Sequence, residues 1–395
     1  MELKQIESQV KSHFNETVKI RRHLHMYPEL SFQEVHTPAY IAEYLRGLGI
    51  EVQEGVGGRG VVGKLIVDES LPTVALRADF DALPIQDLKD TPYKSTVPGV
   101  MHACGHDAHT AIVLTAARIL SSMKDQLKGN IVFIHQHAEE VDPGGAIQMI
   151  ADGCLENVDA IFGTHVTTSL DVGKVGYKYG TATGMPDDFT IKLKGLGGHA
   201  SRPHNAIDPV AAGISLCNQL QYAVTRKSNA MDSVVLSITM FNAGSQHNII
   251  PDEVTIGGTI RTFNHDMQDL MITELNNTLE GLVRTTGVSY DLDYMRGYPP
   301  VVNDDEMTDI VVKSANKIST VSETIRLEPD LGGEDFSYYL QKVPGTFFYT
   351  GVKNSSFKAD FPHHHGHFDI DEKGMMNAVS VMLESVFTYF EKESQ

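Results

Sequence analysis

The stretch GNIVFIHQHAEE, residues 129–140, joins a nearly continuous apolar run to a polar end. Such a run is typical of a strand that is buried on both faces of a parallel sheet. The segments VVGKLIV, TVALRAD and VDAIFGTHV have a similar composition, and AHTAIVLTAARILSSM, residues 108–123, has helical spacing. Strands that alternate with helices predict an α/β fold with a mostly parallel sheet.

Residues 184–297 follow a different pattern. Three runs alternate apolar and polar side chains, DFTIKLKG, SVVLSITMF and EVTIGGTIRTF, and VSYDLDY follows as a fourth strand. Two runs with helical spacing lie between them, at residues 207–224 and 267–283. The order β-α-β-β-α-β predicts a ferredoxin-like unit. Because polar and histidine-rich motifs lie on both sides of it, we interpret it as an insertion that divides the first domain into residues 1–183 and 298–395.

The composition excludes several classes of protein. A formal net charge of -19 argues against binding to nucleic acid, which needs a basic surface. No apolar run reaches about 18 residues, so we expect no membrane span. Three cysteines are too few for a disulfide framework, and the N-terminal residues lack the apolar core of a signal peptide. We therefore expect a cytoplasmic protein with reduced thiols.

Polar residues follow the apolar runs at the points where strands should end. In open α/β sheets, ligands bind beyond the carboxyl ends of the strands, so these residues should meet at one edge. They are Asp79, Asp81, Cys104, His106, Glu139, Glu140 and His165. Taken singly, adjacent acids also suit a solvated turn, and a histidine at a strand end also suits a structural hydrogen bond.

Two motifs near the C-terminus extend this set. FPHHHGHFDIDE contains His363, His364, His365 and His367, and we expect one of them to complete the site. LGGEDFSYY, residues 331–339, is a glycine turn before an acidic helix start. It suits the wall of a pocket and equally suits a helix N-cap.

The side chains in this set favour a transition metal. Thiolate, imidazole and carboxylate together suit Zn, Mn, Co or Ni better than Mg or Ca, whose sites are built of oxygen. No C-x-x-C pair is present, which argues against a closed structural zinc site. A second glutamate beside a ligand suggests hydrolysis by a metal-activated water.

Two rival interpretations remain open from the residues alone. A thiol enzyme would use Cys104 as its nucleophile and His106 or His109 as its base. That interpretation leaves Glu139, Glu140 and the terminal histidines without a role. A non-catalytic binding protein is the other rival, and an intact Glu139 argues against it.

The chain also resembles a known family. The motifs RADFDALP, MHACGHDAHT, HAEE, GGHASRPH, IIPDEVTIGGTIRTF and GGEDFSYYLQKVPG occur in one order, and the match begins near RRHLHMYPELSFQE. Together they resemble the metal-dependent amidohydrolases typified by aminoacylase, hippurate hydrolase and the plant auxin-conjugate hydrolases. The resemblance implies a catalytic α/β domain with two divalent metals and an inserted lid or dimerisation domain.

The resemblance also assigns roles to residues. The implied metal ligands are Cys104, His106, Glu140, His165 and one histidine of the terminal cluster, where the family spacing His-x-x-x-Phe selects His364. For the two metals, the ligand set leads us to expect Mn or Zn, with Ni or Co as alternatives.

The remaining implied roles concern the reaction itself. Glu139 would be the general acid and base. His199 would stabilise the oxyanion, in its own subunit or in an adjacent one. The structural alternatives for His199 are a turn residue after Gly197-Gly198 and a contact in a dimer. Asn248 and Arg261 would bind the substrate carboxylate or the oxyanion, and a structural ion pair is the alternative for Arg261.

The implied activity is hydrolysis of the amide bond of N-acyl amino acids, or of related aminoacyl conjugates or dipeptides. A metal-dependent carboxypeptidase or dipeptidase is the alternative. We expect a homodimer through the inserted domain, and lid hinges near Gly184 and Gly297.

Two departures from the family pattern affect the ligand set. His137 stands where relatives have proline, which makes it an extra ligand or a donor to one. Gly366-His367-Phe368 replaces Pro-Arg-Phe, so the choice among His363, His364 and His365 stays open.

Overall fold

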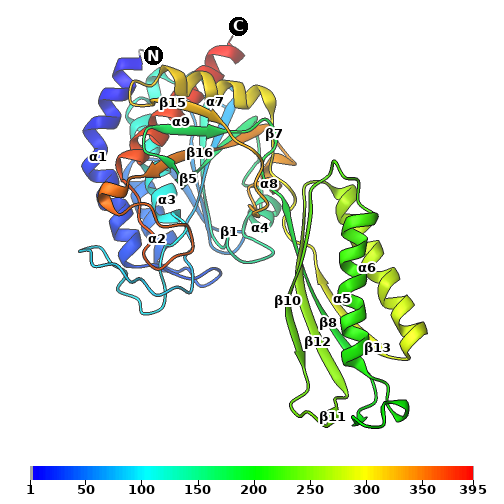
Figure 1. Cartoon of the computed structure of the whole chain (residues 1–395). Coiled ribbons are helices and arrows are strands. Elements are labelled where there is room, and N and C mark those ends of the chain that lie inside the picture. Colours follow the sequence, from blue (N-terminus) through cyan, green and yellow to red (C-terminus); the bar gives the residue numbers. More distant parts are fainter. Residues whose placement is uncertain (1–2, 395) are drawn as a thin grey trace. The chain divides into compact units, whose positions relative to one another are not determined.

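A computed structural model describes residues 3–394, and the chain divides into two compact units (Figure 1). The first unit contains residues 1–182, 301–328 and 335–395, and the second contains residues 183–300 and 329–334. The short segment 329–334 was not part of the expected insertion. It joins the second unit because Thr183 pairs with Asp330 in a β-bridge and the Gly184 amide donates to the Gly332 carbonyl at 3.2 Å.

An eight-stranded sheet forms the centre of the first unit, in the order β1-β2-β4-β3-β5-β16-β6-β15. Its strands are β1 (Glu51–Val56), β2 (Gly60–Leu65), β3 (Thr73–Asp79), β4 (Asn130–Gln136), β5 (Ala160–Asp171), β6 (Lys174–Tyr177), β15 (Glu323–Arg326) and β16 (Gly345–Lys353). The neighbours from β4 to β16 are parallel, whereas β1, β2 and β6 add antiparallel pairs. The expected mostly parallel sheet is confirmed.

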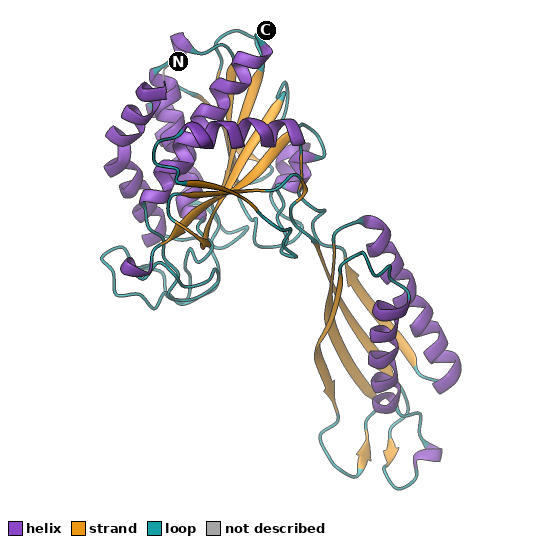
Figure 2. Ribbon diagram, turned by 45° about the horizontal axis from the view of Figure 1, so that its top comes forward, coloured by secondary structure: helices purple, strands orange, loops and turns teal. Residues whose placement is uncertain are grey.

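Helices cover both faces of this sheet, as Figure 2 shows. One face packs against α1 (Leu3–Met26), α2 (His36–Gly47), α3 (His106–Ser122), α7 (Asp305–Lys317) and α9 (Lys373–Glu393), and the other against α4 (Ala146–Ala151) and α8 (Ser337–Leu340). In β4, Phe133 enters the first core while Val132 and Ile134 enter the second. Burial on both faces explains why this strand reads as a continuous apolar run.

The second unit is a four-stranded antiparallel sheet with two helices. The strands are β8 (Met185–Lys194), β10 (Val234–Ala243), β12 (Glu253–Thr262) and β13 (Ser289–Met295), in the order β10-β12-β8-β13. The helices α5 (Pro209–Arg226) and α6 (His265–Thr286) pack on one face of this sheet around a separate core. Chain order β8-α5-β10-β12-α6-β13 is the ferredoxin-like order that the sequence predicts.

Short elements complete the chain. They are β7 (Gly180–Thr181), β9 (Gly198–His199), β11 (Ile249–Ile250) and β14 (Val302–Asn303), of which β9 pairs with β11 and β7 with β14. Three 3-10 turns lie at Lys124–Gln126, Pro203–Asn205 and Ser355–Phe357. Within residues 3–394, no helix combines the length and apolarity that a membrane crossing needs.

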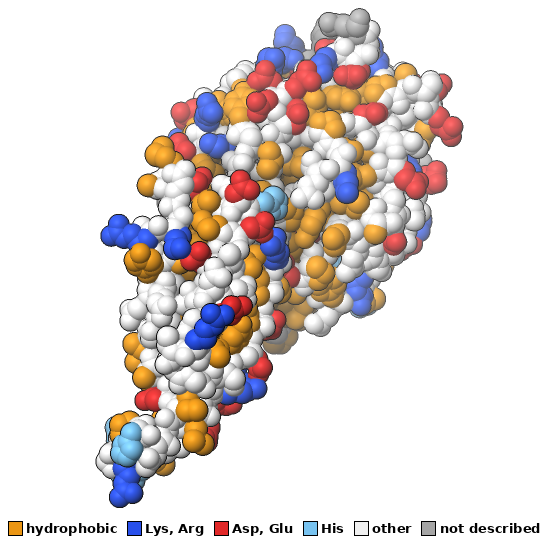
Figure 3. Space-filling view, turned by 90° about the vertical axis from the view of Figure 1, so that its right-hand side faces the viewer, with side chains coloured by type: hydrophobic (Ala, Val, Ile, Leu, Met, Phe, Trp, Pro, Cys, Tyr) orange, Lys and Arg blue, Asp and Glu red, His pale blue; other side chains and the backbone are white. Residues whose placement is uncertain are grey.

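Alternating burial on the strands of the second unit leaves apolar side chains at its surface, where they lie among charged ones (Figure 3). Val235, Met240 and Phe241 on β10 are each about two-fifths exposed, and Ile214 and Tyr222 on α5 are more than half exposed. The outer positions of β13, in contrast, include Asp291 and Asp293. The two edges of this sheet therefore differ in chemistry.

Leu275→Ala should lower the free energy of opening of the second unit by about 2–5 kcal/mol, because it leaves a cavity where α6 buries a leucine completely. Hydrogen exchange measured by mass spectrometry on peptides from residues 185–297 reports this opening without requiring one-step unfolding of the whole chain. Met231→Ala is the control, since that side chain is 88% exposed, and should change the opening by less than about 0.5 kcal/mol. Equal effects of both variants would contradict this core.

Candidate metal centre

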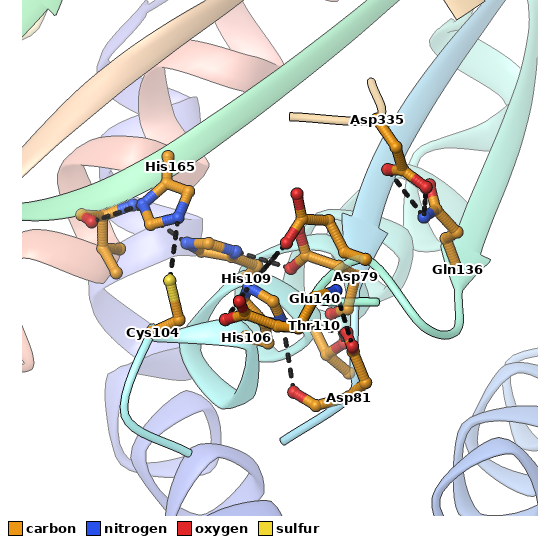
Figure 4. Close-up of polar contacts among 12 residues, drawn as sticks. Asp79, Asp81, Cys104, His106, His109, Thr110, Gln136, Glu140, His165 and Asp335 are labelled. Carbon is orange, nitrogen blue, oxygen red and sulfur yellow. Dashed lines mark hydrogen bonds and ion pairs between the residues drawn. The ribbon is translucent and has the colours of Figure 1, made fainter. Parts of the chain in front are cut away.

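The polar strand ends of the first unit meet at the carboxyl edge of the sheet, as expected (Figure 4). Asp79 ends β3, and Glu139 and Glu140 follow the end of β4. His165 departs from its expected place at a strand exit, because β5 continues to Asp171. However, β5 pairs with β3 only as far as Gly163, so His165 lies just beyond that shared edge.

A glycine brings the loop with Cys104 close to β5. Gly105 has a φ of +99°, a left-handed conformation that favours glycine. A Cβ atom at this position would lie 2.4 Å from Cγ2 of Val166. The absence of a side chain therefore lets Cys104, and His106 at the start of α3, face His165.

Among the described residues, five donor side chains make up two candidate metal-binding groups that share Cys104; three further groups combine His106 or Glu139 with neighbouring acidic residues and, in one case, His109. Of the two groups that share Cys104, one is Cys104, His106 and His165, and the other is Cys104, Glu140 and His364. Within each group the ligand atoms lie within 4.8 Å of one another. Cys104 belongs to both groups, which is the arrangement of a ligand that can bridge two ions.

The structure also distinguishes among the terminal histidines. His364 Nε2 lies 3.3 Å from Glu140 Oε1, and the His364 amide donates to the Ala103 carbonyl at 2.8 Å. His363 packs edge-on against the His165 ring, and His365 stacks on Phe361. Among the described residues, the candidate groups contain His364 and neither of its two neighbours.

The donor atoms fit a divalent ion. His106 Nδ1 pairs with Asp81 Oδ1 at 3.0 Å, whereas its buried Nε2 has no hydrogen-bond partner. Carboxylate oxygens of Glu140, Asp79 and Glu139 lie 3.8–3.9 Å from this Nε2, too far for a hydrogen bond. His165 donates from Nδ1 to the Val166 carbonyl at 2.7 Å, so its Nε2 carries a lone pair that faces Cys104 Sγ. In metal-binding histidines, one ring nitrogen typically forms a hydrogen bond with the protein and the other binds the metal.

Electrostatics at this edge favour a bound cation. Burial alone would lower the pKa of His106, but Asp79, Asp81 and Glu140 reverse this and raise it to about 10. In the absence of an ion, this imidazole therefore holds a proton that offsets the carboxylates. A divalent ion would replace that proton and supply more positive charge.

The same environment makes Cys104 a poor nucleophile. Burial, followed by Glu140 and Glu139, raises the pKa of its thiol well above the ordinary value. Its Sγ lies 3.5 Å from His165 Nε2. His109, one of the two expected bases, is already engaged: Nδ1 pairs with Asp79 at 2.6 Å and Nε2 accepts the Val166 amide at 2.9 Å.

A buried polar network behind the site was missing from the sequence interpretation. Arg77, on β3, donates to Asp79 at 2.6 Å, to Gln136 at 2.9 Å and to Asp335 at 2.8 Å. Asp335 also accepts from Gln136 and from the Ala146 amide. The N-cap of α8 is Phe336, with no side-chain cap, so the helix-cap interpretation of GGEDF is wrong. A lone arginine inside the apolar run TVALRAD was the available signal.

Two other residues near the site have structural partners. Asp107 accepts from Arg21 Nε at 2.8 Å and pairs with His25 Nδ1 at 2.7 Å, which ties the start of α3 to α1. His137 is buried and contacts the Phe32 ring edge-on. Among the described residues, it joins none of the candidate metal groups.

The residues expected to bind the substrate lie in the second unit. His199 and Asn248 are neighbours, because β9 pairs with β11 and the Ala200 amide donates to the Asn248 carbonyl at 3.1 Å. Arg261 is not beside them. Strand β12 begins at Glu253, shortly after β11, and Arg261 lies eight residues further along this strand, which is roughly 27 Å of extended chain. Its Nε donates to Thr259 Oγ1 at 3.0 Å.

Comparison with known proteins gives consistent matches. The profile of peptidase family M20/M25/M40 matches residues 75–387. The Bacillus subtilis protein YhaA, described as an amidohydrolase, is 48% identical over 98% of both chains. An N-acyl-L-amino acid amidohydrolase of Geobacillus stearothermophilus is 41% identical over 77% of this chain and 82% of its own.

A solved structure agrees with these matches. The Bacillus subtilis YXEP protein, described as a dinuclear metal-binding peptidase of the M20 family, is 34% identical. The comparison covers 96% of this chain and 99% of that one, with a TM-score of 0.82. The similarity therefore extends over both units of the chain.

Asp81→Ala should weaken metal binding about 10–100-fold, because Asp81 pins His106 Nδ1 and accepts the Glu140 amide at 3.0 Å. Competition with a coloured chelator measures this affinity. The matched control is Asp125→Ala, at an exposed aspartate, which should leave it unchanged. Unaltered affinity in Asp81→Ala would show that His106 needs no such support.

Proposed function

The chain belongs to peptidase family M20/M25/M40, and on that premise we propose that it hydrolyses N-acyl amino acids to a carboxylic acid and an amino acid. The observation that carries the proposal is the pair of donor groups that share Cys104, with Glu139 beside them. We place the enzyme in the cytoplasm, where its three free cysteines would stay reduced.

In this proposal Cys104, His106, His165, Glu140 and His364 hold two divalent ions, Mn or Zn. Once bound, such ions polarise the amide carbonyl and lower the pKa of water. The side chains contribute by fixed geometry, because Asp81 and the Val166 carbonyl orient the two imidazoles. Holding the donors in place before binding reduces the cost of reorganisation.

Glu139 is the proposed general acid and base. Its side chain is 9% exposed, and its Oε2 lies 3.9 Å from His106 Nε2, so it faces the donor cluster. In the first step Glu139 takes a proton from the attacking water. It then delivers that proton to the leaving amine nitrogen, whose bond to the carbonyl carbon breaks.

His199 is the proposed oxyanion donor, acting in its own subunit or in a partner's. Its Nδ1 accepts the Ser201 amide at 3.1 Å, which places the proton of the neutral ring on Nε2. The side chain is exposed, so this N–H is available to a substrate. Asn248, its neighbour, and Arg261 are proposed to bind the carboxylate of the substrate or the oxyanion. Because a long stretch of β12 separates Arg261 from the other two residues, one substrate would meet Arg261 in one subunit and the pair His199 and Asn248 in the other.

We also propose a homodimer through the second unit. Strand β10 is an edge strand, and Val235, Met240 and Phe241 on it are exposed. Such an edge favours pairing with another strand unless charges block it. The opposite edge, β13, carries Asp291 and Asp293, so pairing through β10 is favoured.

Glu139→Gln should lower kcat on N-acetyl amino acids about 10²–10⁴-fold, because the amide cannot accept the proton of water. Its metal content should stay at that of the wild type, measured by inductively coupled plasma mass spectrometry. Glu51→Gln, at an exposed glutamate on β1, is the control and should be fully active.

Three results would contradict this function. One is retained turnover in Glu139→Gln, and another is activity of the wild type after EDTA has removed its metal. The third is wild-type protein, loaded with Mn or Zn, that cleaves dipeptides but no N-acyl amino acid. That last outcome would favour a dipeptidase.

Val235→Lys should convert the dimer to a monomer, because a charge on β10 opposes edge pairing. Light scattering distinguishes a monomer of 43.4 kDa from a dimer of twice that mass. Met295→Lys places the same charge on β13, where Met295 is 43% exposed, and should leave the dimer intact. A monomeric wild type, or the opposite response of the two variants, would refute this interface.

A further inference from the structure

The turn from His137 to Glu140 carries both the proposed base and a proposed metal ligand. Hydrogen bonds from other parts of the first unit hold its backbone. Gln136 Nε2 donates to the His137 carbonyl at 3.3 Å, the Gly145 amide to the Ala138 carbonyl at 3.2 Å, and the Glu140 amide to Asp81 at 3.0 Å. The remaining tether runs to Glu34.

This turn has an uncommon backbone conformation. Ala138 has a φ of +51°, in the left-handed region that residues with a Cβ atom rarely adopt. Ala138 is completely buried, so water cannot satisfy its amide. The next residue is Glu139, and any relaxation at Ala138 would move both glutamates.

Glu34 supplies the partner that this amide needs. Its side chain is completely buried, and Oε1 accepts the Ala138 amide at 3.0 Å. Two neighbours in the same segment also reach the site: Ser31 donates to Asp81 at 2.7 Å, and Phe32 contacts His137. The segment 31–34 therefore holds the turn from one side.

The other contacts of Glu34 are weaker. Arg59 Nε lies 4.0 Å from Oε2, and Arg59 Nη1 donates to the Glu34 backbone carbonyl. Burial raises the pKa of the Glu34 carboxyl to about 8. Because Oε1 acts as an acceptor toward the Ala138 amide, the amide oxygen of glutamine can take its place, and glutamine is a close replacement in size and hydrogen bonding.

We infer that Glu34 is a positioning residue for the reaction: its hydrogen bond to the Ala138 amide holds the left-handed turn that aims Glu139 and Glu140 at the metal centre. This inference rests on the proposed role of Glu139. It assigns a task to the N-terminal motif PELSFQE, which contributes no metal ligand.

The test uses four variants of the full chain: Glu34→Gln, Glu34→Ala, Ala138→Gly, and Glu34→Ala combined with Ala138→Gly. Glu34→Ala should lower kcat about 10–100-fold with KM changed less than about threefold, because the base is misplaced by a fraction of an ångström or more. Glu34→Gln keeps the acceptor and should stay within about threefold of the wild type. Ala138→Gly alone should do the same.

The double variant is the decisive measurement. Glycine adopts a φ of +51° without a Cβ penalty, so loss of the tether should drive the turn out of this conformation less strongly. We expect Glu34→Ala with Ala138→Gly to recover at least half of the lost kcat on a logarithmic scale. Relief of the Cβ strain at Ala138 would also stabilise the fold, so kcat is compared per folded protein in all four variants, and a recovery beyond that of the folded fraction assigns a role in positioning.

Metal affinity gives a second readout that does not depend on turnover, since Glu140 lies on the same turn. Chelator competition should show weaker binding in Glu34→Ala and recovery in the double variant. Wild-type kcat and metal affinity in a folded Glu34→Ala variant would overturn the inference, and so would an absence of rescue by Ala138→Gly. If the wild type cleaves no N-acyl amino acid, the proposed function fails, and the metal-affinity series still decides whether Glu34 holds the turn.

Discussion

Buried negative charge at one edge of the sheet is the constraint on which the rest of the site depends. Asp79, Asp81 and Glu139 are buried, and Glu140 and Cys104 lie beside them. Like charges taken out of water at this spacing are strongly unfavourable unless cations or hydrogen bonds offset them. The raised pKa of His106 shows the demand for positive charge, and a pair of divalent ions would meet it directly.

Two fully buried arginines support this edge from different directions. Arg77 joins β3 to Gln136 and to Asp335, which lies 258 residues further along the chain. Arg21, on α1, donates to Asp107, which follows the proposed metal ligand His106. It also donates to Asp369, which lies five residues after the proposed ligand His364, and both distances are 2.8 Å. Each guanidinium therefore ties distant segments together through charge-assisted hydrogen bonds, which are stronger than neutral ones. The first hundred residues thus act mainly by holding in place the proposed metal ligands, which all come from later parts of the chain.

Much of the fold and part of the site could be predicted from the sequence. Apolar runs such as IVFI in β4 reveal a buried sheet because both faces exclude water, and the alternation in DFTIKLKG reveals a sheet covered on one face only. The positions at which the parallel strands end predict that Asp79, Glu139 and Glu140 lie at the same edge of the sheet. The register of β5 could not be predicted, since its extension past β3 depends on pairing with β16. The tether from Glu34 to Ala138 was equally hidden, because it depends on one positive φ angle and on a contact across 104 residues.

The direct measurement of the metal centre is anomalous diffraction at the metal absorption edge, from crystals of the protein loaded with Mn or Zn. Two anomalous peaks should appear, one among Cys104, His106 and His165 and the other among Cys104, Glu140 and His364, with Cys104 Sγ between them. A single peak, or two peaks of which neither contacts Cys104, would contradict a dinuclear centre bridged by this cysteine.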